Sequence, residues 1–262
     1  ATPALDARLL LQRVAGLTHE EIVSSPSLEI TAGAEFRALI ARRERHEPVS
    51  RILGEREFYG RAFKVTGAVL DPRPETECLV EEALRLGRSD ARILDLGTGS
   101  GAIIVTLLAE WPGATGVATD ISAEALAVAR ANSGRLLGAD RVRLVHGNWF
   151  EGVEGEFDLI VSNPPYIVHA DLGGLPRDVR DFDPAVALDG GADGLAAYRE
   201  IARAARPHLS GDGSILVEIG AGQEAEVEAI FRQAGFALDA AKTDLAGHVR
   251  SLAFRFRSLA FR

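Results

Sequence analysis

Four consecutive residues, Asn163-Pro164-Pro165-Tyr166, directly follow an apolar run over residues 157–162. A run of this length and composition predicts a buried strand of a parallel sheet. Because open α/β sheets bind ligands at the carboxyl ends of their strands, we expect a ligand site at these four residues. Neither proline carries an N–H, so the turn is stiff and rich in hydrogen-bond acceptors. Such a site suits a substrate with an –NH2 group, although Asn-Pro also marks plain turns that end strands.

Strands and helices alternate from about residue 91 onward. Strands are expected at 93–96, 116–120, 142–145, 157–162 and 214–218, and helices at 101–110, 122–132, 195–205 and 222–234. The last segments, 236–238 and 249–254, are expected to close the sheet as a hairpin. The pattern predicts an α/β fold with a doubly wound, mostly parallel, seven-stranded Rossmann-like sheet and helices on both faces.

The first 55 residues differ from the rest of the chain. Leu5, Leu9 and Val14 recur at helical spacing, and Thr18 is placed to cap a second helix. We therefore predict a small all-α domain over residues 1–55.

A linking segment follows at 56–84. Its first part, residues 56–72, carries aromatic and β-branched residues around two glycines, which predicts a hairpin. Its second part opens a helix after Pro72-Arg73-Pro74, since proline favours the first turn of a helix. The α/β domain then covers residues 85–256. Residues 257–262 repeat the RSLAFR of residues 250–255, and we interpret them as a duplicated tail and an artefact, because real repeat units are far longer.

Composition restricts the classes of function. The net charge of −9 disfavours a broad basic surface for nucleic acid, so no direct nucleic-acid binding is expected. The single cysteine, Cys78, allows no internal disulfide and fits a reducing compartment. No apolar stretch approaches the length of a membrane span, and no signal-peptide pattern precedes the first helix. We expect a cytoplasmic protein without a membrane partner.

A glycine-rich loop follows the first strand of the α/β domain. The expected cofactor-binding residues are Gly97, Thr98, Gly99, Ser100, Gly101, Asp120, Trp149 and Asn163. Glycines let the backbone approach a ligand closely, and a carboxylate at the end of the next strand can accept both ribose hydroxyls. Trp149 can flank an adenine or simply pack in the core. Together these features indicate an adenosine-containing cofactor.

The loop alone leaves an NAD enzyme open, because Gly97, Gly99 and Ala102 also satisfy the dinucleotide fingerprint. Two features favour S-adenosylmethionine. Asp95 lies two residues before the first glycine, where it would repel a pyrophosphate and attract a cationic amino-acid group. NAD chemistry also gives no role to the Asn-Pro-Pro-Tyr turn.

The chain resembles the release-factor glutamine N5-methyltransferases, which depend on S-adenosylmethionine. The resemblance covers nearly the whole chain and rests on Pro-Arg-Pro-Glu-Thr-Glu at 72–77, the loop at 95–101, Asn-Trp-Phe at 148–150, Asn-Pro-Pro-Tyr-Ile at 163–167, Asp-Pro-Ala-Val-Ala-Leu at 183–188 and Glu-Ile-Gly at 218–220. The run at 72–77 separates this family from the DNA amino-methyltransferases that share the Asn-Pro-Pro-Tyr turn. Gly-His-Val-Arg at 247–250 departs from the family, which more often has an acidic residue before the arginine.

The resemblance implies methylation of the glutamine in the Gly-Gly-Gln motif of peptide-chain release factors, with residues 1–55 docking the protein substrate. Two enzyme alternatives remain open: methylation of an amino group of DNA or RNA, and methylation of a ribosomal-protein glutamine. A non-catalytic module that binds an adenosine nucleotide is a third alternative, from another class.

Catalysis by this site requires orientation more than acid–base strength, since a carboxamide nitrogen is a weak nucleophile. The side-chain oxygen of Asn163 and the backbone carbonyl of Pro164 can each accept one substrate N–H, and Tyr166 can stack on the planar amide. We therefore expect Asn163, Pro164 and Tyr166 to be catalytic, and Asn163, Pro164, Pro165 and Tyr166 to bind the substrate. No metal is expected, because the six histidines show no ligand spacing with a cysteine.

Overall fold

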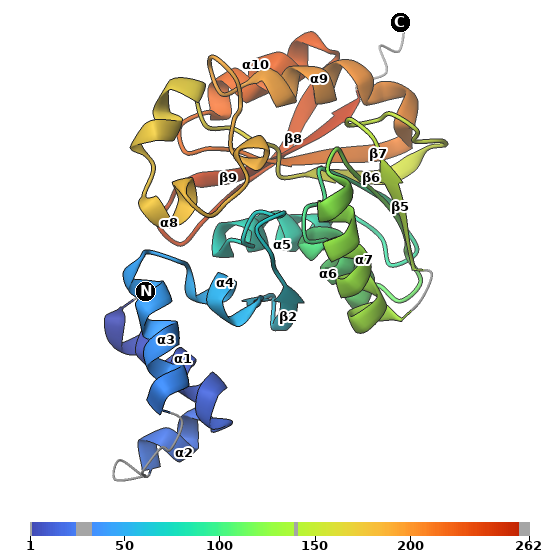
Figure 1. The fold of residues 1–262 in the computed structure, drawn as a ribbon. Helices are drawn as coiled ribbons and strands as arrows, with labels where there is room; N and C mark the ends of the chain where they lie inside the picture. The colour runs from blue at the N-terminus through green and yellow to red at the C-terminus, as the bar shows by residue number, and fades with distance from the viewer. Residues whose placement is uncertain (1, 25–32, 139–140, 257–262) are drawn as a thin grey trace, which may run out of the picture.

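The computed structural model describes residues 2–24, 33–138 and 141–256. Within these residues, seven strands form one sheet with the order β5-β4-β3-β6-β7-β9-β8 (Figure 1). Strands β5 to β7 pair in parallel, and β9 runs antiparallel to both β7 and β8. The strands are β3 (Arg92–Leu96), β4 (Thr115–Asp120), β5 (Val142–His146), β6 (Phe157–Ser162), β7 (Leu209–Glu218), β8 (Phe236–Thr243) and β9 (Val249–Phe256). The predicted doubly wound sheet and its terminal hairpin are confirmed.

Helices cover both faces of this sheet. On one face lie α5 (Glu77–Leu86), α6 (Ala102–Glu110) and α7 (Ala123–Leu137), and on the other lie α9 (Ala196–Ala204) and α10 (Glu224–Gln233) (Figure 1). The strands build the two hydrophobic layers by alternation. Leu94 and Leu96 of β3 pack in the cluster that includes α9 and α10, whereas Ile93 packs in the cluster that includes α5 and α6. Successive side chains of a strand point to opposite faces, so buried parallel strands are apolar throughout.

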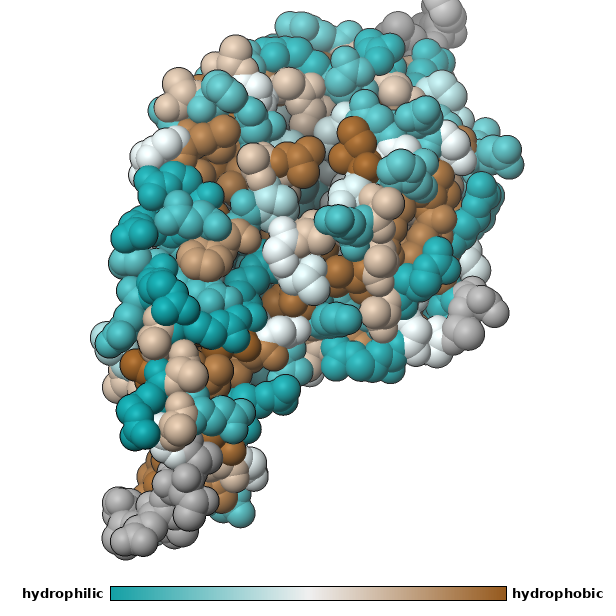
Figure 2. Space-filling model, in the orientation of Figure 1, coloured by the Kyte–Doolittle hydropathy of each residue, from teal (hydrophilic) through white to brown (hydrophobic). Residues whose placement is uncertain are grey.

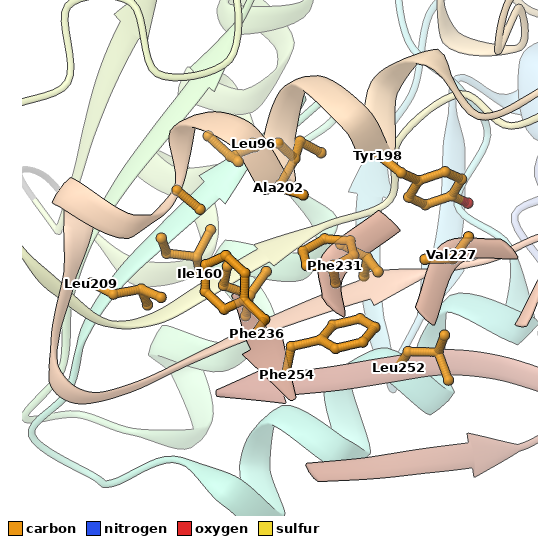
Figure 3. Packing of buried hydrophobic residues seen from close by; sticks show 14 of the residues in the cluster. Leu96, Ile160, Tyr198, Ala202, Leu209, Val227, Phe231, Phe236, Leu252 and Phe254 are labelled. Carbon is orange, nitrogen blue, oxygen red and sulfur yellow. The ribbon is translucent and has the colours of Figure 1, made fainter. Parts of the chain in front are cut away.

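Aromatic stacking joins α10 to the sheet. The rings of Phe231 on α10 and Phe254 on β9 lie parallel, with centroids 4.2 Å apart (Figure 3). On α9, the Tyr198 hydroxyl donates to the backbone carbonyl of Glu218 at 3.0 Å. These contacts hold α9 and α10 against the carboxyl-terminal half of the sheet, where β7 ends beside the site described below.

The amino-terminal part is helical, as predicted, and lies below the sheet in Figure 1. Its helices are α1 (Pro3–Ala15), α2 (His19–Ser24), α3 (Gly33–Glu44) and α4 (Val49–Leu53). Thr18 and Glu21 cap α2 reciprocally: the Glu21 amide donates to the Thr18 hydroxyl at 3.2 Å, and the Thr18 amide donates to the Glu21 carboxylate at 2.7 Å. This exchange satisfies two amide groups that the first turn leaves free.

The predicted linking hairpin is present as β1 (Glu55–Phe58) and β2 (Arg61–Lys64). It is tied to α5 by the Glu77 carboxylate, which accepts the Tyr59 amide at 2.8 Å. Among the described helices, none has both the length and the apolar character that a membrane crossing requires.

The structure adds elements for which the sequence gave no period. Between β6 and α9 lie η2 (His169–Gly174), α8 (Arg177–Arg180) and η3 (Ala185–Ala187), while η1 (Pro74–Thr76) precedes α5 and η4 (Arg206–His208) follows α9. Strand β7 begins five residues before the predicted 214, because two glycines and an aspartate hide its first half from propensity arguments. The duplicated tail at 257–262 lies outside the described residues.

Candidate active site

A cavity of about 340 Å³ opens at the carboxyl ends of β3, β4 and β6. This volume lies within the range of small-molecule sites. Predicted site residues that line it are Gly97, Thr98, Gly99, Ser100, Asp120, Trp149, Asn163, Pro164 and Pro165. Gly101 and Tyr166 lie outside its lining. In Figure 2, apolar side chains gather in the middle of this face of the sheet domain, and hydrophilic side chains surround them.

The loop after β3 depends on its glycines. Gly97, Gly99 and Gly101 have φ angles of 69°, 56° and 79°, in the left-handed region that side chains disfavour. Gly101 begins α6 and faces α7, where an added Cβ would lie 3.4 Å from Ala129. Gly101 therefore shapes the loop from behind, while Gly97 and Gly99 expose the backbone to the cavity.

Asp120, at the end of β4, connects this loop to the cavity wall. One carboxylate oxygen accepts the Gly99 amide at 2.8 Å, and the other accepts the Ser122 amide at 2.9 Å. Each carboxylate oxygen can accept a further bond, so both stay available to hydroxyl groups of a ligand. Asp120 thus fixes the loop and presents negative charge to the cavity.

Asp95 is placed differently from what its sequence position suggested. Its side chain is fully buried under the loop and does not line the cavity. One oxygen accepts the Thr98 hydroxyl at 2.7 Å, and Oδ1 has no partner among the described residues. Burial raises the pKa of Asp95 to about 7, against the opposing effect of the Thr98 hydrogen bond. A direct contact with a cationic ligand group is therefore not what this geometry provides.

Trp149 combines the two interpretations that the sequence left open. Its ring lines the cavity and also packs against the core cluster that contains β3 and α9. A Cβ added to Gly97 would lie 3.7 Å from Cζ3 of this ring, so the glycine leaves room for it. The ring closes the side of the cavity nearest to the end of β5.

Asn163 is held by a residue from the segment before α5. Its Nδ2 donates to the Thr76 hydroxyl at 3.1 Å, across 87 positions of sequence. Because the amide nitrogen is engaged by the protein, the side-chain oxygen is left as a free acceptor. The backbone of Pro164 follows with a carbonyl and no competing donor. The turn therefore presents two acceptors, as the sequence analysis expected.

A second cavity of about 260 Å³ lies on the other side of Asn163. It is lined by Leu70, Arg73, Glu75, Asn163, Tyr166, Ile167, Leu175, Val179, Ala187, Leu188, Glu218 and Arg250. Asn163 thus lines both cavities, and Tyr166 lines this one. Burial raises the pKa of Tyr166 to about 12, so its hydroxyl stays protonated and can donate a hydrogen bond.

Several wall residues escaped the sequence analysis. Val69 and Leu70 come from the segment after β2, while Pro184 and Val186 come from the segment after α8. The only sequence signal for the second pair was the run at 183–188, which the family resemblance included without a role. Within the described residues, no cluster of three or more His, Cys, Asp or Glu side chains could hold a metal ion.

Two family models match the chain. Residues 1–54 match the PrmC N-terminal domain, and residues 74–174 match the methyltransferase small domain. The chain is 45% identical, over 97% of its length, to the release factor glutamine methyltransferase of Agrobacterium fabrum, of which it covers 91%. It is 46% identical, over 95% of its length, to the release factor glutamine methyltransferase of Caulobacter vibrioides, of which it covers 88%.

Solved methyltransferase structures share the fold. The hMettl16 catalytic domain in complex with MAT2A 3'UTR hairpin 6 has a TM-score of 0.64 and 18% identity, covering 80% of this chain and 82% of that one. Ribosomal protein L11 methylase from Lactobacillus delbrueckii subsp. bulgaricus has a TM-score of 0.55 and 23% identity, covering 77% of this chain and 91% of that one. At these identities the likeness concerns the fold alone.

Proposed function

Because the chain belongs to the release factor glutamine methyltransferase family, we propose that it transfers a methyl group from S-adenosylmethionine to a glutamine side chain of a peptide-chain release factor. The acceptor is the amide nitrogen of the glutamine in the Gly-Gly-Gln motif. The observation that carries the proposal is the place of Asn163 on the wall shared by the two cavities. A methyl donor in the larger cavity and an amide in the smaller one would meet at this residue.

The residues of the larger cavity fit S-adenosylmethionine. Gly97 and Gly99 expose backbone at φ angles that a side chain would strain, and the Asp120 carboxylate keeps acceptor capacity for ribose hydroxyls. Trp149 offers a flat apolar surface for an adenine. When bound, S-adenosylmethionine supplies a methyl group that its sulfonium already activates.

The turn after β6 orients the glutamine amide. The Asn163 side-chain oxygen and the Pro164 carbonyl each accept one N–H of the substrate, which aims the nitrogen lone pair at the methyl group. The N–C bond forms as the S–C bond breaks, and a proton then leaves the nitrogen. Both hydrogen bonds strengthen as positive charge develops on nitrogen, so they stabilise the transition state more than the ground state. Tyr166 lies against the second cavity, where its ring can cover the planar amide.

Residues 1–55 are proposed to dock the protein substrate, since the family model for the amino-terminal domain matches residues 1–54. The helices α1 to α3 lie beside the sheet domain, not over the larger cavity (Figure 1). This arrangement leaves the site open while adding a surface for a folded partner. We also propose a cytoplasmic location, in keeping with the single free cysteine, Cys78.

Mass spectrometry of a release factor incubated with the protein and S-adenosylmethionine tests the function. We expect a mass gain of one methyl group on the Gly-Gly-Gln peptide, and none on a factor whose glutamine is replaced by glutamate. DNA, RNA and ribosomal protein are incubated in parallel. Comparable transfer to a nucleic-acid adenine would move the enzyme to another substrate class, and cofactor binding without transfer to any substrate would indicate a binding module.

A further inference from the structure

Glu218 is a buried carboxylate for which the reaction above gives no role. It ends β7, and its side chain is 2% exposed. Strand pairing sets Ser162 opposite Val217, so Asn163 and Glu218 follow at neighbouring positions of the two strands. A buried acidic side chain beside the proposed acceptor site requires an explanation, because burying a charge is unfavourable unless it is hydrogen-bonded.

Thr76 joins Glu218 to Asn163. Thr76 is 4% exposed and accepts the Asn163 Nδ2 group at 3.1 Å. Hydrogen bonds from Thr76 and Asn163 favour the ionised form of Glu218, as does the positive charge of Arg250. The three side chains come from η1, the turn after β6 and the end of β7, so only tertiary packing brings them together.

We propose that Glu218 is a positioning residue, which acts through Thr76 to hold Asn163 with its nitrogen toward the protein and its oxygen toward the substrate amide. This inference rests on the proposed function. A carboxylate accepts hydrogen bonds and cannot donate them. The Thr76 hydroxyl therefore donates to Glu218, and its lone pairs accept from Asn163. The reversed orientation of the Asn163 amide would set two N–H groups against the N–H groups of the substrate.

The unpartnered oxygen of Glu218 supports this role over a purely structural one. Its Oε2 is buried without a hydrogen-bond partner among the described residues. A carboxylate kept only for stability would be replaced at little loss by an apolar side chain of similar volume. At this position, however, an apolar side chain would leave Thr76 free to donate to Asn163, and the direction of the chain of hydrogen bonds would be lost.

Four variants test the role: Glu218→Gln, Thr76→Val, Thr76→Ser and Glu82→Gln. Glu218→Gln and Thr76→Val remove the direction of the hydrogen bonds with little change of shape. Thr76→Ser keeps the hydroxyl. Glu82→Gln is the matched control, because Glu82 is also a buried glutamate, 5% exposed, and pairs with Arg85 on α5. For each variant, kcat and KM on a release factor, cofactor affinity by calorimetry and the thermal midpoint are measured.

We expect Glu218→Gln and Thr76→Val to lower kcat by about 10–100-fold, the usual loss when a partner that orients a functional ligand is removed. KM and cofactor affinity should stay within about threefold of the unmodified protein, since the interaction lost acts mainly in the transition state. Thr76→Ser should recover most of kcat, and Glu82→Gln should match the unmodified protein. In a second readout, the side-chain amide NMR signal of Asn163, which exchanges slowly with solvent in the unmodified protein, should exchange faster in Thr76→Val.

Three outcomes would overturn the inference. These are an unchanged kcat in both Glu218→Gln and Thr76→Val, a loss of cofactor affinity as large as the loss of kcat, and a Thr76→Ser variant as slow as Thr76→Val. If the unmodified protein transfers no methyl group, the proposed function fails first. The NMR exchange of Asn163 in the Glu218 and Thr76 variants then decides the positioning role by itself, and unchanged exchange refutes it.

Discussion

Asp183 and Arg51, 132 positions apart in the sequence, form a buried ion pair with Nη2 and Oδ1 2.6 Å apart. Their side chains are 1% and 5% exposed. The second oxygen of Asp183 pairs with Arg73, also at 2.6 Å. Arg51 further donates to the backbone carbonyls of Thr66 and Val69. One carboxylate thus joins α4, the segment after the hairpin and the run that forms part of the cavity wall.

Replacing Asp183 with asparagine is expected to destabilise the protein. The two arginines would keep their charges without a counter-ion, and breaking a buried pair in this way costs about 3–5 kcal/mol. Denaturant unfolding measures the loss, and calorimetry should show weaker cofactor binding, because Val69 and Pro184 line the cavity on either side of the pair. The matched control is Asp193→Asn, which removes a pair with Arg199 that is half exposed on both sides. It should cost at most about 1 kcal/mol. Equal losses in the two variants would contradict this account.

Asp120→Ala is expected to weaken S-adenosylmethionine binding by about 1.5–3 kcal/mol, the range for lost hydrogen bonds to a charged group. The variant also frees the Gly99 amide, so the loop itself should loosen. Calorimetry gives the affinity. Glu124→Ala removes an exposed carboxylate from the next helix and should leave binding unchanged. Unchanged affinity in Asp120→Ala, or tighter binding of NAD than of the sulfonium, would reject this placement of the cofactor.

Asn163→Ala is expected to lower turnover by about 10²–10³-fold, as when one preorganised hydrogen-bonding group is removed. The fold should survive, because the side chain ends a strand beside a cavity and makes one hydrogen bond, to Thr76. Single-turnover kinetics measure the chemical step, and cofactor affinity is measured in parallel because Asn163 lines both cavities. A variant that methylates at a rate near that of the unmodified protein would show that the motif is merely a turn.

The stability of the protein should depend on Asp95 between about pH 4 and pH 7. Burial raises its pKa in the folded state to about 7, above the value of an unfolded aspartate. Its contribution is therefore fully present below about pH 4 and is lost as pH rises, by about 1.4 kcal/mol per pH unit and up to about 4 kcal/mol in all. The difference between the unfolding free energies of Asp95→Asn and the unmodified protein isolates this group from the other carboxylates. Parallel curves over this range would refute the shift.

Removing residues 1–46 is expected to reduce kcat/KM on an intact release factor by about tenfold or more, since a docking surface would be lost. The deletion ends before α4, because Arg51 must remain to pair with Asp183. Cofactor affinity and turnover of a short Gly-Gly-Gln peptide should change little, and they serve as internal controls. Full activity of the shortened protein on the intact factor would place docking elsewhere.

The period of the apolar residues decided the elements of this protein. Alternating apolar faces and strand-length runs depend on near neighbours, so the seven strands, the terminal hairpin and the amino-terminal helices could be predicted from the sequence. The same local information placed the glycine loop and Asn163 at the carboxyl edge of the sheet. Short 3₁₀ turns and the glycine-containing start of β7 lack a period and could not be predicted.

Only the tertiary structure decided how the polar residues act. Asn163 and Thr76 are 87 positions apart, and Asp183 and Arg51 are 132 apart. No local pattern encodes such pairs, because they depend on how distant segments pack. Asp95 shows the same limit: its position in the loop suggested a contact with the ligand, yet burial under that loop sets its pKa and removes it from the cavity wall. Local periodicity therefore determines where the site lies, and packing determines the protonation, orientation and partners of the side chains within it.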